Sequence, residues 1–158
     1  LLPPLFVKKH SCVERSVAIN KPKEQVFAFV KQAKNQDRFN KWILADPQVK
    51  KSYRGEDGTV GFVYAWDSKE VGKGEQEIQR ISEGERVDFA LRFQEPFESN
   101  AAAHMTTQTL AGNQTKLTWR MEGSNSYPMN LMNLFVPSVL GNDLETSLTT
   151  LKTILEKQ

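Results

Sequence analysis

The chain has 158 residues, of which 39% are hydrophobic and 25% are charged, as is typical of one soluble globular domain with a sizeable core. Its 21 basic and 19 acidic residues give a net charge of only +2, and no RNA- or DNA-binding motif is present, so nucleic acid is not an expected partner. The single cysteine, Cys12, excludes an intramolecular disulfide and a multi-cysteine metal cluster.

The N-terminal residues 1–11 form a segment distinct from the predicted domain, which covers residues 12–158. The apolar run Leu1–Val7 is followed by Lys8 and Lys9. A membrane-spanning helix needs about 20 apolar residues, so this run is too short to cross a bilayer. Two interpretations stay open: the remnant of a signal or anchor helix with the lysines beside the membrane, or a disordered leader. The location of the protein is accordingly left open between the cytoplasm and a membrane tether.

One strand and two short helices are predicted at the start of the domain. Residues 12–19 alternate between apolar and polar side chains, which indicates a strand. Pro22 can begin a helix because its missing N–H is not needed in the first turn. Phe39, Trp42 and Ile43 repeat the i, i+3, i+4 spacing of a second short helix.

Between Val49 and Met121 the hydrophobic period changes to two, and turn segments such as "GEDG", "SEGE" and "AGNQ" separate the alternating runs. Consecutive strands joined by short turns predict an antiparallel meander with one buried face and one solvated face. The two glycines of "GKGEQ", residues 72–76, predict a bulge or a sharp bend in one of these strands.

The last segment predicts an amphipathic helix of about five turns, because its leucines recur at helical spacing. These leucines are Leu140, Leu144, Leu148, Leu151 and Leu155. The apolar stretch "SYPMNLMNLFVPSVLG", residues 126–141, precedes most of this helix and contains Pro128 and Pro137. Pro137 is expected to break or kink the helical backbone before the main helix begins.

Five segments, in this order along the chain, resemble the motifs of one superfamily. They are "VERSVAINKPKEQVFAFV", "FNKWI", the long run "DGTVGFVYAWDSKEVGKGEQEIQRISEGERVDFALRFQEPF", "TKLTWRMEG" and "GNDLETSLTTLKTILE". They are similar to motifs of the START/polyketide-cyclase superfamily, also called SRPBCC. In chain order, these motifs are the first strand with its P-x-x-VF helix, the aromatic-x-x-Trp helix, the central strands, the T-x-V-x-W-x-M-x-G strand and the final helix. The resemblance covers about residues 12–157.

The resemblance implies an α+β helix-grip fold like that of the birch pollen allergen. In this fold a seven-stranded, strongly curved antiparallel sheet wraps around a long C-terminal helix, with two short helices between strands 1 and 2. It also implies an internal cavity between the sheet and that helix. Members of the superfamily bind lipids, sterols, polyketides or other hydrophobic ligands, and a minority catalyse cyclisation or dehydration. The fold alone does not choose among these functions.

Inward-facing strand residues, together with apolar residues near the last helix, are the candidate ligand contacts. They are Phe62, Tyr64, Trp66, Gln76, Phe89, Leu91, Phe93, Met105, Trp119, Met121, Met129, Met132, Phe135 and Leu140. The same residue types also fill an ordinary core, so core packing and ligand contact both stay open for each of them.

Three details of this set have interpretations of their own. Gln76 occupies an inward position where the pattern predicts a hydrophobic residue, so it is either a polar cavity contact or a hydrated residue near the sheet edge. The superfamily geometry places the segment before the long helix beside the cavity entrance. Met129, Met132 and Phe135 would then cover the mouth, or else form a turn that caps the core. Tyr64 and Trp119 each need a hydrogen-bond partner if they are buried.

No catalytic constellation is predicted. His10 lies in the leader and His104 on the outward face of its strand, and no residues have the spacing of a metal site or a catalytic triad. No metal or other cofactor is therefore expected. Arg92 and Arg120 share the outward face with Glu75 and Glu77, which predicts ion pairs across the strands.

Three functions follow as hypotheses, and the oligomeric state stays open. The favoured one is binding of a small hydrophobic ligand such as a lipid or polyketide. The second is a polyketide cyclase/dehydrase-type enzyme, which would need a titratable group inside the cavity. The third is a co-chaperone-like protein-interaction module, which would need an exposed apolar patch of more than a few hundred Å².

Overall fold

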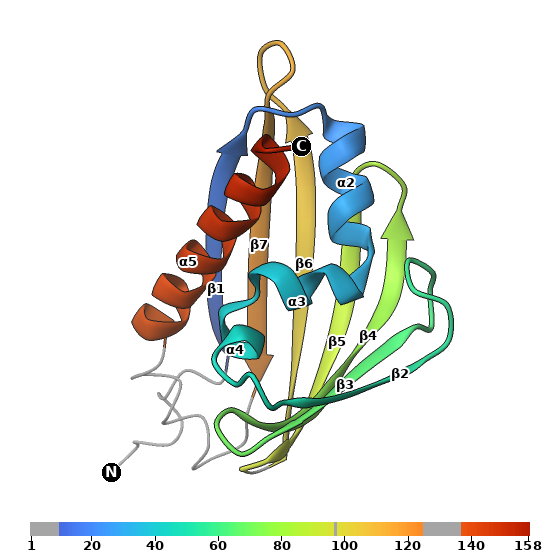
Figure 1. The fold of residues 1–158 in the computed structure, drawn as a ribbon, viewed down its shortest axis with the longest axis vertical. Coiled ribbons are helices and arrows are strands. Elements are labelled where there is room, and N and C mark those ends of the chain that lie inside the picture. The colour runs from blue at the N-terminus through green and yellow to red at the C-terminus, as the bar shows by residue number, and fades with distance from the viewer. Residues whose placement is uncertain (1–9, 97, 125–136) are drawn as a thin grey trace.

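The computed structural model describes residues 10–96, 98–124 and 137–158. Its centre is a seven-stranded antiparallel sheet in the order β1-β7-β6-β5-β4-β3-β2. The sheet curves strongly, so that β2, β3 and β4 turn across one end of the molecule (Figure 1). The strands are β1 (His10–Ile19), β2 (Lys50–Arg54), β3 (Val63–Ser68), β4 (Gly72–Ser82), β5 (Arg86–Glu95), β6 (Ser99–Thr109) and β7 (Thr115–Ser124).

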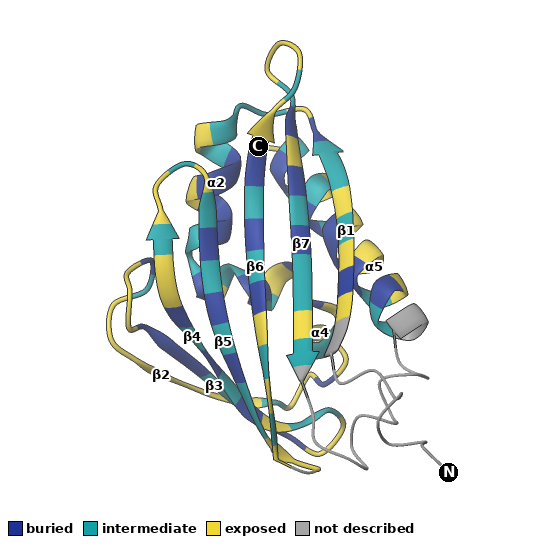
Figure 2. Cartoon of the chain, turned by 180° about the vertical axis from the view of Figure 1, so that it is seen from behind, coloured by how far each residue is buried: buried dark blue, intermediate teal, exposed yellow. Residues whose placement is uncertain are grey.

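The helices lie on one face of this sheet, and the view from behind shows the strands in front of them (Figure 2). Helix α5 runs along β1, whereas α2 lies in front of the upper part of β5, next to β6 (Figure 1). The helices are α2 (Lys23–Lys31), the 3₁₀ turn η1 (Ala33–Asn35), α3 (Gln36–Phe39), α4 (Lys41–Leu44) and α5 (Pro137–Glu156). The predicted helix-grip fold is confirmed, and its long C-terminal helix has 20 residues.

The second predicted helix is divided at Asn40. This residue has an extended backbone, with φ −71° and ψ 115°, so α3 ends there and α4 begins after it. The Asn40 side-chain oxygen accepts hydrogen bonds from the backbone N–H groups of Trp42 (2.9 Å) and Ile43 (3.3 Å). Asparagine is among the preferred N-cap residues because its oxygen pairs with N–H groups that lack a partner in the first turn. The divided helix therefore places the Asn40 side chain at a fixed point above the sheet.

The strands bury one face, as their alternation predicts. On β5, Val87, Phe89 and Leu91 are buried while their neighbours are only partly so. Trp119 on β7 and Met105 on β6 point to the same side and are buried as well. Dark buried residues consequently alternate with lighter ones along these strands (Figure 2). The core lies between this face and the helices, and its α5 part is formed by Leu144, Leu148, Leu151 and Leu155.

The solvated face carries the ion pairs, with one correction to the expected partners. Arg92 on β5 binds Glu75 (2.8 Å) and Glu77 (2.7 Å) on β4, as predicted. Arg120 does not join them, because β6 and β5 separate its strand from β4. It binds Glu14 on the adjacent β1 instead, at 3.3 Å. Exposed pairs of this kind contribute about 0–1 kcal/mol each.

Gly74 of β4 allows an aromatic side chain to lie across the strand. The register of β4 with β5 shifts between Lys73 and Gly74, which confirms the predicted irregularity. A Cβ atom at Gly74 would lie 2.8 Å from Cζ2 of Trp66 and 2.7 Å from the carbonyl oxygen of Arg92. Glycine at this position therefore leaves room for the Trp66 indole over the sheet.

Some predictions fall outside the described residues. The segment 1–9 does so, and so do the three residues expected at the cavity mouth, Met129, Met132 and Phe135. No helix in the described part of the chain is long and apolar enough to cross a membrane.

Candidate ligand cavity

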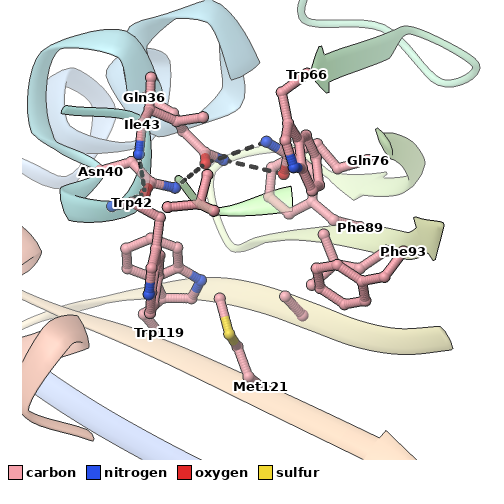
Figure 3. A pocket seen from close by; sticks show the side chains of 13 residues that line it. Gln36, Asn40, Trp42, Ile43, Trp66, Gln76, Phe89, Phe93, Trp119 and Met121 are labelled. Carbon is pink, nitrogen blue, oxygen red and sulfur yellow. Dashed lines mark hydrogen bonds between the residues drawn. The ribbon is translucent and has the colours of Figure 1, made fainter. Parts of the chain in front are cut away.

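A cavity of about 260 Å³ lies between the sheet and the short helical segment that contains α3 and α4. Aromatic and aliphatic side chains form its walls, and three carboxamides lie together on the helical side (Figure 3). The described lining residues are Gln36, Asn40, Trp42, Ile43, Trp66, Val71, Gln76, Phe89, Leu91, Phe93, Ala103, Trp119 and Met121. Five of them, Trp42, Trp66, Val71, Phe93 and Met121, are only partly buried.

Part of the candidate set lies at the cavity wall. These residues are Trp66, Gln76, Phe89, Leu91, Phe93, Trp119 and Met121, and their contact with a ligand stays a prediction. Phe62, Tyr64 and Met105 lie outside the described lining because they are fully packed within the core. Leu140, in the first turns of α5, packs against the core and is likewise not among the described lining.

The position of the cavity differs from the expected one. It was predicted between the sheet and the C-terminal helix, but no described residue of α5 lines it. The reason is the close packing of α5, whose Leu144, Leu148, Leu151 and Leu155 are at most 1% exposed. The space remains instead beneath α3 and α4, where helices of only four residues cover the sheet.

Six of the lining residues are not among the predicted ligand contacts. They are Gln36, Asn40, Trp42, Ile43, Val71 and Ala103. The sequence contains one relevant signal, the spacing of four between Gln36 and Asn40, which places both amides on one side of a helical turn. Nothing in the sequence shows that Gln76, forty positions away from Gln36, meets them.

Hydrogen bonds join the three carboxamides into one buried chain (Figure 3). Gln36 and Gln76 donate to each other, with nitrogen–oxygen distances of 3.2 and 3.1 Å. Asn40 donates to the Gln36 oxygen at 2.9 Å. All three are buried, with exposed fractions of 2% for Gln36, 7% for Asn40 and 6% for Gln76. Buried amides that bond to one another avoid most of the cost of leaving water, so Gln76 is a member of a polar cluster and not a hydrated edge residue.

The sequence of this chain matches, over residues 10–156, the family described as polyketide cyclase/dehydrase and lipid transport. The chain belongs to this family. No curated protein sequence matches the chain significantly.

Solved structures with the same fold include other proteins of very different sequence. A truncated norcoclaurine synthase from Thalictrum flavum has a TM-score of 0.72 at 6% identity, covering 94% of this chain and 95% of that chain. A protein from Chromobacterium violaceum has a TM-score of 0.64 at 16% identity, with 92% and 96% covered. The protein Ara h 8.0201 has a TM-score of 0.62 at 10% identity, with 94% and 99% covered. At these identities the similarity shows the fold alone.

Beside the cavity of this polyketide cyclase/dehydrase family member, a buried tyrosine pairs with a carboxylate. The Tyr64 hydroxyl donates a hydrogen bond to Asp37, which also lies 3.2 Å from the Lys51 ammonium group. Burial and the Asp37 carboxylate raise the pKa of Tyr64 well above the ordinary tyrosine value. Tyr64 therefore has the partner that its burial requires, and it holds the β3 strand to the α3 helix.

The raised pKa of Tyr64 predicts a loss of stability in alkaline solution. The folded state keeps this proton more tightly than the unfolded state, so the contribution is complete below about pH 10 and is lost as the pH rises above it. One such group lowers the free energy of unfolding by up to about 1.4 kcal/mol per pH unit. Urea unfolding of the wild type and of Tyr64→Phe at pH 8 and pH 11 measures this effect. The wild type should lose more stability than the variant, and equal losses would contradict the assignment.

Among the described residues, no group of three His, Cys, Asp or Glu side chains is arranged to hold a metal ion. His104, on the outward face, lies 3.2 Å from Arg86, and burial together with that guanidinium lowers the pKa of His104. This histidine is on the opposite side of the sheet from the cavity, as its strand position predicts.

Proposed function

We propose that this polyketide cyclase/dehydrase family member binds a small hydrophobic ligand in the cavity beneath α3 and α4. The observation that supports this is the mainly apolar, aromatic lining of the cavity, interrupted by one compact group of carboxamides. Binding sites for small molecules commonly combine apolar walls with a few convergent polar groups that orient the ligand. The family description, which includes lipid transport, is consistent with such a role.

The cavity volume suggests the size of the ligand. An engineered protein cavity of about 150 Å³ accommodates benzene, whereas the volume here is about 260 Å³. A compact two-ring molecule is therefore a suitable size, and a longer ligand would extend past the partly exposed lining residues.

Binding is favoured over catalysis because of the side chains that a ligand would meet. General acid–base catalysis needs a titratable group within hydrogen-bond reach of the reacting atoms. The described lining provides aromatic rings, aliphatic groups and neutral amides. The salt bridge between Asp37 and Lys51 lies outside this lining. The cavity is therefore suited to holding and orienting an apolar molecule.

Intrinsic fluorescence provides the test, because all three tryptophans of the chain line the cavity. We expect tetralin, a two-ring hydrocarbon, to produce a saturable change in tryptophan emission and to raise the melting temperature, as any ligand of the folded state does. Native mass spectrometry of protein purified from cells would identify a compound already bound. The proposal fails if tetralin gives no saturable change up to its solubility limit and no hydrophobic compound copurifies.

A further inference from the structure

The carboxamide chain has unequal numbers of unused donors and acceptors. Three carboxamides have six N–H donors and six acceptor sites on their oxygens. Gln36, Asn40 and Gln76 each donate one hydrogen bond, which leaves three N–H groups unused among the described residues. The oxygens of Gln36 and Asn40 each accept two bonds, and that of Gln76 accepts one. Counting only bonds between described residues, one acceptor site is left, so unused donors outnumber unused acceptors in this part of the cavity wall.

The backbone of α4 determines which way each amide faces. The Asn40 oxygen must face the N–H groups of Trp42 and Ile43. In the reverse orientation the amino group of Asn40 would face these two N–H groups, and no hydrogen bond could form. The Asn40 amino group therefore faces Gln36, which must present its oxygen there. The amino group of Gln36 then faces the oxygen of Gln76, and the amino group of Gln76 faces the oxygen of Gln36. One helix cap thus sets the polarity of the whole chain.

A further donor lies at the same cavity. Trp119 lines the cavity and is 2% exposed. Its indole contacts the rings of Phe39 and Trp42 edge to face, at centroid distances of 5.8 and 6.3 Å. Its N–H has no hydrogen-bond partner within the described part of the chain. Buried indole N–H groups usually have a partner, so a ligand oxygen would satisfy a group that the described residues leave unpaired.

We propose that the cavity selects hydrophobic ligands that carry a hydrogen-bond-accepting oxygen, such as the carbonyl of a ketone or an ester. This inference rests on the proposed binding function and adds the chemistry of the ligand to it. The apolar walls take the hydrocarbon part, and the carboxamide donors of Gln36, Asn40 and Gln76 take the oxygen. A ligand whose only polar group is a donor would compete for the single unused acceptor site on Gln76.

A pair of nearly isosteric probes separates this selectivity from hydrophobic binding. 1-Tetralone carries a carbonyl where 1-methylenetetralin carries a C=CH₂ group, and the two molecules have the same rings. The ratio of their dissociation constants, measured by isothermal titration calorimetry, is compared between the wild type and variants. The free energy of transferring each probe out of water is the same in every measurement. Differences between the ratios therefore report the protein contacts alone.

The variant Asn40→Asp should reverse the polarity of the carboxamide chain. Aspartate is as good an N-cap as asparagine, so α4 keeps its first turn. The free carboxylate oxygen of the new residue would accept from Gln36, and Gln36 and Gln76 would then turn their amides over. In this variant, two of the three carboxamide N–H groups that are unused in the wild type would be lost. Unused acceptor oxygens would take their place. We expect the preference for 1-tetralone over 1-methylenetetralin to fall by about tenfold, the value of one ordinary hydrogen bond.

Three controls make the result decisive. Measurement at pH 8 keeps the new carboxyl ionised, which its two backbone donors also favour. Asn142→Asp makes the same chemical change at an exposed position of α5 and should leave the ratio unchanged. Asn40→Ser, a neutral N-cap, releases Gln36 and should also lower the preference, which keeps the test valid if Asn40→Asp does not fold.

The outcomes distinguish this inference from the proposed function. If 1-methylenetetralin binds but the ratio is the same in the wild type, Asn40→Asp and Asn40→Ser, selection by the carboxamides is overturned while hydrophobic binding stands. If neither probe binds to the wild type, the inference is overturned, and the proposed function falls with it if no hydrophobic compound copurifies with the protein. A ratio that falls equally in Asn142→Asp would also overturn the inference, because that residue is exposed on α5.

Discussion

A Trp119→Ala substitution is expected to lower the free energy of unfolding by about 3–5 kcal/mol, the usual cost of removing a large aromatic side chain from a core. Trp119 is 2% exposed and lies on β7, between Arg15 of β1 and Met105 of β6 in the register of the sheet. Its removal loses the edge contact with Phe39 and enlarges the cavity that Trp119 already borders. Since small domains are stable by only about 5–15 kcal/mol, this one change should remove a large part of the total.

Urea unfolding followed by far-ultraviolet circular dichroism measures this effect without relying on tryptophan emission. Thr118→Ala serves as the matched control on the same strand, because Thr118 faces outward and its hydroxyl bonds to that of Ser16 at 2.8 Å. That control should cost no more than about 1 kcal/mol. A loss below about 1 kcal/mol for Trp119→Ala would show that the described packing around this residue is wrong.

An Ala103→Leu substitution is expected to weaken tetralin binding at least tenfold while the protein stays folded. Ala103 lines the cavity from β6, and its partners in the sheet register are Phe89 on β5 and Met121 on β7, which also line it. A leucine side chain at this position would enter the cavity between those two residues. Because it would occupy existing space and displace no packed atoms, stability should be unchanged or higher, as for other cavity-filling substitutions.

Ala102→Leu is the matched control for this prediction. Ala102 is the next residue on the same strand and is exposed on the outer face of the sheet. The same change in volume there should leave the tryptophan fluorescence titration with tetralin as it is in the wild type. Unchanged tetralin binding in Ala103→Leu, with a melting temperature at least that of the wild type, would place the binding site elsewhere.

The strand pattern predicted much of the fold and part of the cavity wall for the same reason. Side chains alternate across a sheet, so the inward positions of β5 and β7 can be read from the period of two. Phe89, Leu91, Trp119 and Met121 were recognised in this way and lie at the cavity. Periodicity shows only which face a residue occupies, however. Met105 shares that face and lies in the packed core away from the described lining.

The polar part of the candidate site was not predictable in the same manner. Gln76 interrupts a hydrophobic pattern in the sequence, but its partner Gln36 lies on a different element. The sequence predicts a continuous helix through Asn40. The role of Asn40 as an N-cap follows from the break in that helix. Contacts between segments distant in sequence depend on how the helical segment crosses the sheet, which local spacing does not specify.

The sequence by itself determined the element order, the inward and outward faces of the strands, the amphipathic C-terminal helix and, through five motifs, the superfamily that it resembles. These properties are local, because hydrophobic period, turn residues and caps act over a few positions. Only the tertiary structure decided that α5 packs tightly and that the cavity lies beneath α3 and α4. It also brought Gln36, Asn40 and Gln76 together. A void and a buried polar cluster are properties of several elements at once, since each depends on the spacing and angle at which those elements pack.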